Sequence, residues 1–131
     1  MANHGGLDEC VFGSIRKPGR APLAGNRETG GYEALRKAAL EMSHEKLVEE
    51  ISDSGHAGRR GAGFPTGRKW KAVAEAPGHP KTIVCNADEG EPGCFKDRAI
   101  MDHDPHAVIE GMALAARATG ATRGFFYLRY V

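Results

Sequence analysis

A strand–helix–strand pattern in the C-terminal half of the chain constrains the fold most. The β-branched run TIVC predicts a buried strand over residues 81–86, and the run GFFYL predicts a second strand over 124–130. Between them, residues 105–119 show helical periodicity, with Asp104 as the expected N-cap and Pro105 at the first helical position. Strands joined through one helix form a βαβ unit with parallel strands and a right-handed crossover. The predicted fold class is therefore α/β.

Shorter helices are expected ahead of this unit. Residues 31–42 place apolar side chains on one helical face, and residues 43–55 do the same after Ser43, an expected N-cap. A further helix of about two turns is predicted over 67–76, where Pro and Gly follow. Residues 1–30 are rich in Gly, Pro, Arg and Asn without apolar periodicity, which indicates an extended or disordered leader.

Bulk composition excludes several functions. The chain has 131 residues, enough for one domain with a core, and its net charge of +1 gives no general attraction to nucleic acid or membrane. No apolar run is long enough to span a bilayer, and the N-terminus lacks a secretory signal. Cys10, Cys85 and Cys94 form no CxxC pair, so we expect reduced thiols and a cytoplasmic location. No metal site is expected, because His103 and His106 flank a helix start and their rings would diverge.

The stretch GRRGAGFPTGRKW, residues 58–70, combines glycines with cations. Glycine permits positive φ and lets backbone N–H groups approach a ligand, and the helix that follows has a partial positive charge at its N-terminus. Arg59 and Lys69 add full charges, so phosphate is the expected ligand. The stretch is not a G-x-G-x-x-G fingerprint, because no strand precedes it, and not a P-loop, because Trp70 follows the lysine. A basic loop without a ligand is the alternative.

An acidic turn, CNADEGEPG, comes directly after the first predicted strand. The carboxyl ends of parallel strands are where α/β sheets bind ligands. Carboxylates do not suit a phosphate, but Asn86 and Asp88 could accept hydrogen bonds from the amide and hydroxyl groups of a flavin ring or ribityl chain. The spacing does not match a calcium loop, and no nucleophile accompanies the carboxylates, so no catalytic residue is assigned. A solvated acidic turn is the alternative.

Taken together, SGHAGRRGAGFPTGRKW, CNADEGEPGCFKDR and MDHDPHAVIEGMALAARATGA resemble the FMN- and NADH-binding flavoprotein subunit, of the 51 kDa type, of respiratory NADH:quinone oxidoreductase, complex I. They are also similar to the diaphorase subunits of NAD-reducing hydrogenases and NAD-dependent formate dehydrogenases. The resemblance covers residues 28–129. It implies that residues 31–131 are the incomplete N-terminal part of a Rossmann-like FMN/NADH-binding domain.

The resemblance implies a role for each matched residue. On the glycine-rich side, the residues expected to wrap FMN and hold its phosphate are Gly58, Arg59, Gly61, Gly63 and Lys69. On the acidic side, the residues expected to hold the ring and ribityl chain are Asn86, Asp88 and Glu89. The expected NADH contacts are Phe64 and Glu91.

The implied chemistry is hydride transfer from NADH to FMN, followed by single electrons to iron–sulfur clusters and on to quinone. The cofactor performs this chemistry, so no side chain need act as an acid or base. The full-length family holds a [4Fe–4S] cluster whose cysteine ligands are absent from this chain. Expected partners are NADH and other subunits of a complex I-like or hydrogenase-like assembly, among them a thioredoxin-like [2Fe–2S] subunit. Within complex I the protein would be peripheral to the inner face of the membrane.

Several positions depart from the family pattern. Arg60 replaces a glycine, and a Cβ costs about 1 kcal/mol or more where φ must be positive. His56 and Ala57 replace Leu-Arg, and Ala72 replaces an aromatic residue. We expect an N-terminal fragment or truncated form that is inactive in isolation. The alternative hypotheses are a non-catalytic remnant, a diaphorase part, and a generic phosphate-binding α/β module.

Overall fold

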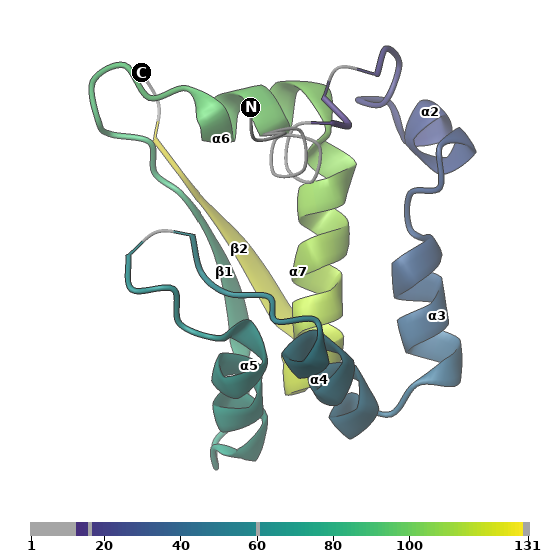
Figure 1. Ribbon diagram of the computed structural model, residues 1–131, viewed down its shortest axis with the longest axis vertical. Coiled ribbons are helices and arrows are strands. Elements are labelled where there is room, and N and C mark those ends of the chain that lie inside the picture. Colours follow the sequence, from purple (N-terminus) through teal and green to yellow (C-terminus); the bar gives the residue numbers. More distant parts are fainter. Residues whose placement is uncertain (1–12, 16, 60, 130–131) are drawn as a thin grey trace, which may run out of the picture. The chain divides into compact units, whose positions relative to one another are not determined.

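A computed structural model describes residues 13–15, 17–59 and 61–129 (Figure 1). Arg60 and Cys10 therefore lie outside the described residues. The helices and strands, in chain order, are α2 (Leu23–Glu28), α3 (Glu33–Glu41), α4 (His44–Asp53), α5 (Thr66–Glu75), β1 (Thr82–Ala87), α6 (Lys96–His103), α7 (Pro105–Thr119) and β2 (Arg123–Leu128).

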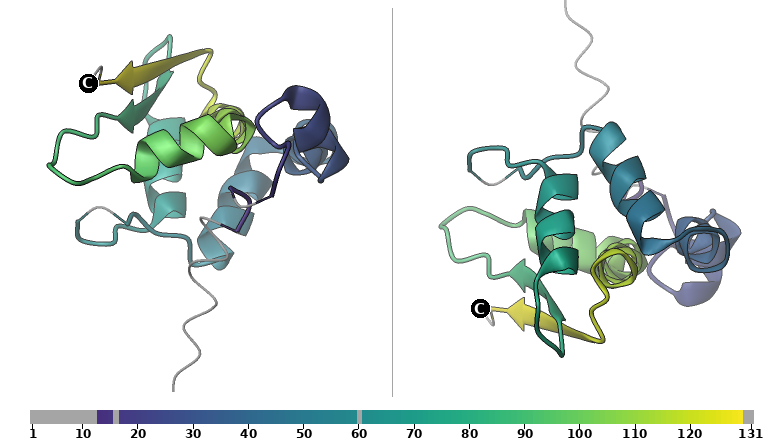
Figure 2. Two further views of the ribbon diagram at one scale, coloured as in Figure 1. Left: turned by 90° about the horizontal axis from the view of Figure 1, so that it is seen from above. Right: turned by 90° about the horizontal axis from the view of Figure 1, so that it is seen from below.

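The two strands confirm the predicted fold class. β1 and β2 are neighbours in one two-stranded sheet, and their arrows point the same way in Figure 2. α6 and α7 lie between them in the sequence, so the connection is a βαβ crossover. The long helix begins at Pro105 and ends at Thr119, as its sequence signals predict. At its C-terminus Gly120 has a φ of 74°, the left-handed conformation that favours glycine after a helix.

The described residues form two compact units, and each is described by itself. The first unit takes its residues from segments 1–33, 86–110 and 126–131. The second unit takes its residues from segments 34–85 and 111–125. The glycine-rich stretch thus belongs to the second unit and the acidic turn to the first.

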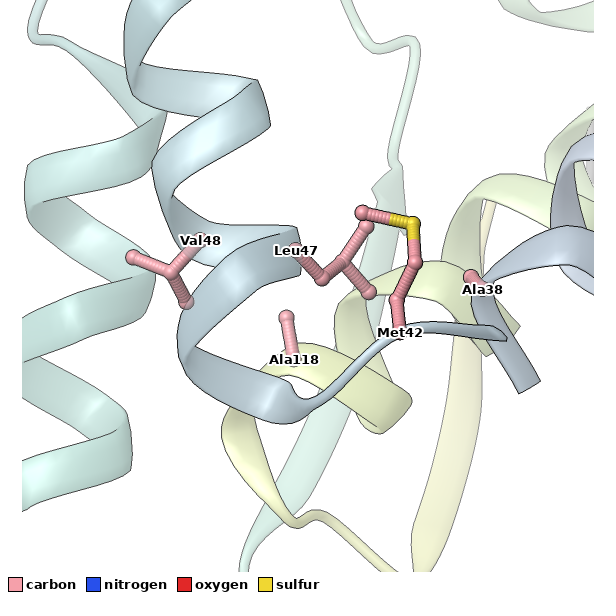
Figure 3. Packing of buried hydrophobic residues seen from close by; sticks show 5 residues of the cluster. All are labelled: Ala38, Met42, Leu47, Val48 and Ala118. Carbon is pink, nitrogen blue, oxygen red and sulfur yellow. The ribbon is translucent and has the colours of Figure 1, made fainter. Parts of the chain in front are cut away.

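The second unit has a small apolar core (Figure 3). Its buried members are Ala38, Met42, Leu47, Val48 and Ala118, and Trp70 and Leu114 pack against them. α4 begins after Ser43, whose hydroxyl accepts the Lys46 N–H at 3.2 Å, and this confirms the predicted N-cap. Trp70 belongs to the core rather than to a ligand site.

The first unit is organised by a buried ion pair. The Arg20 guanidinium donates to both carboxylate oxygens of Asp104, at 3.2 and 3.3 Å, and the Asn26 amide donates to the same carboxylate at 3.1 Å. All three residues are buried. The prediction of an extended or disordered leader is therefore wrong for this stretch, which contains α2 and is held through Arg20. The carboxylate that was expected to cap α7 is occupied by these partners.

A second helix, α6, was also absent from the sequence prediction, which placed an acidic loop up to residue 97. Among its described residues none is buried, so it lacks the apolar face that would have revealed it. Next to it in the first unit, Tyr32 donates its backbone N–H to Glu110 at 2.9 Å, and its hydroxyl lies 2.8 Å from His106 Nδ1. Burial first, and the Glu110 charge second, raise the pKa of Tyr32.

Candidate functional site

The glycine-rich loop is closed at its base by a short antiparallel bridge. Ala57 and Pro65 form the bridge, and the Gly58 N–H donates to the Phe64 carbonyl at 3.0 Å. The Thr66 N–H donates to the His56 carbonyl at 2.9 Å, and the Thr66 hydroxyl lies 2.8 Å from His56 Nδ1. His56, one of the departures from the family pattern, therefore helps to close the loop.

Two glycines inside the loop have backbones that require glycine. Gly61 has a φ of 104° and Gly63 a φ of 66°, as expected for a loop that turns its N–H groups toward a ligand. Gly58 is a member of the closed base and does not have a positive φ. Gly67 serves helix packing instead, because a Cβ there would lie 2.0 Å from Ser52 Oγ and 2.8 Å from Ser52 Cα.

The loop leads directly into the N-terminus of α5. Pro65 precedes the helix and provides no side-chain cap. In the part of the chain that the structure describes, the N–H groups of Gly67 and Arg68 have no hydrogen-bond acceptor. Arg59 and Lys69 are exposed on either side of these groups in the sequence. Free donors, a helix dipole and exposed cations are together suited to an anion.

Phe64 lies exposed beside this helix. Half of its surface is accessible (50%), and the Arg68 guanidinium lies 5.5 Å from its ring centroid, at cation–π distance. Arg68 was not singled out by the sequence analysis, although it stands within the cationic stretch. The exposed ring is consistent with the stacking role implied for Phe64.

The acidic turn after β1 is built from two local devices. The Asn86 side-chain oxygen accepts the Asp88 N–H at 3.1 Å, so Asn86 shapes the turn while it stays exposed. Residues 91–94 form a second turn, in which the Cys94 N–H donates to the Glu91 carbonyl at 3.1 Å and Gly93 has a φ of 81°. The Cys94 thiol donates to the Glu91 carboxylate at 3.5 Å. This bond, with burial and the Glu91 charge, raises the pKa of Cys94, so the thiol stays protonated.

Glu89 has a structural task that the sequence did not indicate. Its carboxylate accepts the backbone N–H groups of Asp97 at 3.0 Å and Arg98 at 3.2 Å, which are at the start of α6. The Lys96 ammonium lies 3.2 Å from the same carboxylate. Burial alone would raise the pKa of Glu89, but the hydrogen bonds and Lys96 outweigh it, so the pKa lies below its ordinary value. Glu89 is therefore the ionised cap of α6, and its contact with a flavin stays a prediction.

A hollow of about 540 Å³ adjoins the acidic turn within the first unit. Glu89 and Glu91 line it, together with Met101 of α6 and Arg129 after β2. A Cβ on Gly90 would lie 2.3 Å from Arg129 Nη1, so the close approach of this cation depends on glycine. Arg129 was missed by the sequence analysis, because only the fold brings it to the turn.

The predicted site residues therefore fall into two groups. Those of the glycine-rich loop, with Phe64 and Lys69, lie together in the second unit, and those of the acidic turn lie together in the first. That the two groups hold opposite ends of one ligand stays a prediction.

The comparisons with known proteins decide the family. Residues 51–130, which include both groups, match the Nuo51 FMN-binding domain. The chain belongs to this family. The resemblance noted in the sequence is thereby confirmed.

Members of the family with curated names occur in two kinds of enzyme. A NADH-quinone oxidoreductase subunit of Rhizobium meliloti, the second of its F type, is 56% identical over 100 residues, which cover 76% of this chain and 24% of that protein. NADP-reducing hydrogenase subunit HndC of Solidesulfovibrio fructosivorans is 50% identical over 99 residues, covering 76% of this chain and 20% of that protein. This chain thus spans about a quarter or less of the relatives that it matches.

A solved structure supports the fold. The crystal structure of an NAD+-reducing [NiFe]-hydrogenase in the air-oxidised state matches with a TM-score of 0.68 and 40% sequence identity. The match covers 82% of this chain and 19% of the hydrogenase chain. Within the described residues, the structure has no helix whose length and apolarity would let it cross a membrane.

Proposed function

We propose that this chain is the part of an NADH-oxidising flavoprotein subunit that holds FMN and the incoming nucleotide. The observation that carries the proposal is the family match over residues 51–130, which spans the glycine-rich loop, α5, β1 and the acidic turn. The generic phosphate-binding module, by contrast, would need only the first of these features.

The residues present fit the phosphate end of FMN. The loop has positive φ at Gly61 and Gly63, and a Cβ on Gly61 would meet no atom within 4 Å, so the backbone there is open to a ligand. The N–H groups at the start of α5 would donate to the phosphate, and Arg59 and Lys69 would neutralise it. Gly58 would contribute through the closed base of the loop rather than by direct contact.

The acidic turn fits the organic end. Asn86 and Asp88 would accept or donate hydrogen bonds at the ring and ribityl chain, and Glu89 would keep the turn in place by capping α6. Phe64 and Glu91 would orient the nucleotide that reduces the flavin. When bound, FMN supplies the chemistry, since it accepts a hydride and passes electrons on singly.

The assembly follows from the same proposal. We place the chain in a complex I-type NADH dehydrogenase, cytoplasmic and peripheral to the membrane, because relatives as similar as 56% are subunits of NADH-quinone oxidoreductase. Electrons would leave through iron–sulfur clusters, including the [4Fe–4S] cluster of the full-length family and a thioredoxin-like [2Fe–2S] partner. The structural match to an NAD+-reducing hydrogenase favours a hydrogenase diaphorase as the second candidate.

Quenching of flavin fluorescence on titration with the full chain tests the proposal. We expect FMN to bind, and Lys69→Ala to weaken it roughly tenfold, the loss of one charge-assisted hydrogen bond. Lys71→Ala is the matched control, because Lys71 is an exposed cation of the same helix that pairs with Glu75 at 3.8 Å. Equal affinities for the Lys69 variant and the wild type would remove Lys69 from the phosphate site. Absence of FMN binding by the wild type would contradict the proposal itself, and NADH-to-ferricyanide turnover would exclude the non-catalytic remnant.

A further inference from the structure

We infer that a second hollow, beside α5, binds the adenosine end of the pyridine nucleotide and prefers the 2′-phosphorylated form, NADPH, to NADH. This inference rests on the proposed function, because it specifies which nucleotide the flavoprotein accepts. The hollow has a volume of about 530 Å³ and lies entirely within the second unit. Its lining includes Phe64, Ala72, Val73 and three cations, Arg68, Lys69 and Lys81.

The hollow offers surfaces for a planar base. Phe64 is half exposed, and the planar guanidinium of Arg68 already lies over its ring at 5.5 Å. A purine can stack on an aromatic ring or on a guanidinium plane, and the apolar side chains of Ala72 and Val73 extend the same lining. Ala72 leaves room where a second aromatic residue was expected from the family pattern.

The charge of the hollow distinguishes the two nucleotides. Sites that read the 2′-hydroxyl of NADH use a carboxylate, whereas sites for the 2′-phosphate of NADPH use an arginine. No carboxylate lines this hollow among the described residues. The only acidic residue of α5, Glu75, lines a different hollow and pairs there with Lys71. The cations of the first hollow are thus not neutralised from their own helix.

Two of these cations are placed for a phosphate without calling on Lys69, which we assign to FMN. Arg68 is held against Phe64, and a guanidinium can bind a phosphate through two parallel hydrogen bonds. The Lys81 ammonium donates to the Ala74 carbonyl at 2.6 Å, and an ammonium has two further donors. A relative at 50% identity is named as a subunit of an NADP-reducing hydrogenase, so the family includes use of this nucleotide.

Calorimetric titration of the full chain with adenosine 2′,5′-bisphosphate and adenosine 3′,5′-bisphosphate tests the inference, because the two ligands carry the same charge. We expect the 2′,5′ isomer to bind at least tenfold more tightly, with a preference that shrinks as salt is added. Arg68→Gln should abolish most of this preference. Lys71→Gln, which removes the same charge from the same helix outside the hollow, should preserve it.

Each other outcome overturns the inference. Equal binding of the two isomers would show that the hollow does not read the 2′-phosphate. An undiminished preference in Arg68→Gln would place the reading site elsewhere. If FMN binds in the fluorescence titration and neither bisphosphate does, the inference fails while the proposed function stands; if FMN also fails to bind, the proposed function fails with it.

Discussion

At the scale of single residues, the Glu89 carboxylate joins the acidic turn to α6. Its folded pKa lies below the ordinary value of 4.5, so its ionised form stabilises the fold. This contribution is fully present above the ordinary pKa and is lost as pH falls through the lowered pKa of the folded state. We expect Glu89→Gln to lower the melting temperature at pH 7, and the difference from the wild type to vanish as both are acidified toward pH 3.

Thermal unfolding followed by circular dichroism between pH 7 and pH 3 measures this effect. Glu49→Gln is the control, because Glu49 is an exposed carboxylate of α4, and such substitutions change stability little. Coincident melting curves for the wild type and Glu89→Gln at every pH would show that the cap contributes nothing.

Residue type alone predicted the glycine loop better than it predicted this cap. Positive φ at Gly61 and Gly63 agrees with the sequence analysis, since glycine is favoured there for a reason that is local to the backbone. Glu89 and Gly67 had other tasks, because the α6 N-terminus and Ser52 meet them only in the folded chain. Composition could therefore identify the loop as special, but not which of its glycines serve packing.

At the scale of elements, α4 and α5 approach so closely that Gly67 has no room for a Cβ. A methyl group there would lie 2.8 Å from the Cα of Ser52, which is backbone and cannot rotate away. We expect Gly67→Ala to lower the free energy of unfolding by about 1–3 kcal/mol, the usual cost of overpacking. Gly111→Ala is the control, because Gly111 is a glycine of α7 with open space at its Cβ position. There, alanine should be neutral or stabilise by about 0.5–1 kcal/mol.

Urea denaturation of the two variants gives both values. A Gly67→Ala protein as stable as the wild type would mean that the two helices can separate at no cost.

Elements whose signals are local were predicted, and elements held by distant contacts were not. Ser43 and Pro105 mark the starts of α4 and α7 within the sequence itself. α2, which spans only six residues, and α6, which has no buried residue among those described, depend on partners elsewhere in the chain. Glu89 holds α6, and the Arg20–Asp104 pair secures the segment that contains α2.

At the scale of the whole molecule, the Arg20–Asp104 pair joins segments 84 residues apart in the sequence. The two side chains are 8% and 4% exposed, so neither charge is well solvated. Removing one member of such a pair leaves the other charge buried without a partner, which typically costs about 3–5 kcal/mol. We therefore expect Arg20→Met to destabilise the chain by an amount in this range.

The exposed pair Lys37–Glu50 provides the comparison for urea denaturation. Its members are 56% and 55% exposed at a separation of 3.5 Å, so Lys37→Met should cost no more than about 1 kcal/mol. The double variant Arg20→Met/Asp104→Leu should recover much of the loss, because it leaves no buried charge without a partner. If Arg20→Met costs no more than Lys37→Met, the N-terminal segment is not held by this pair, and the first unit must be stabilised by its remaining contacts, such as those of Tyr32 with Glu110 and His106.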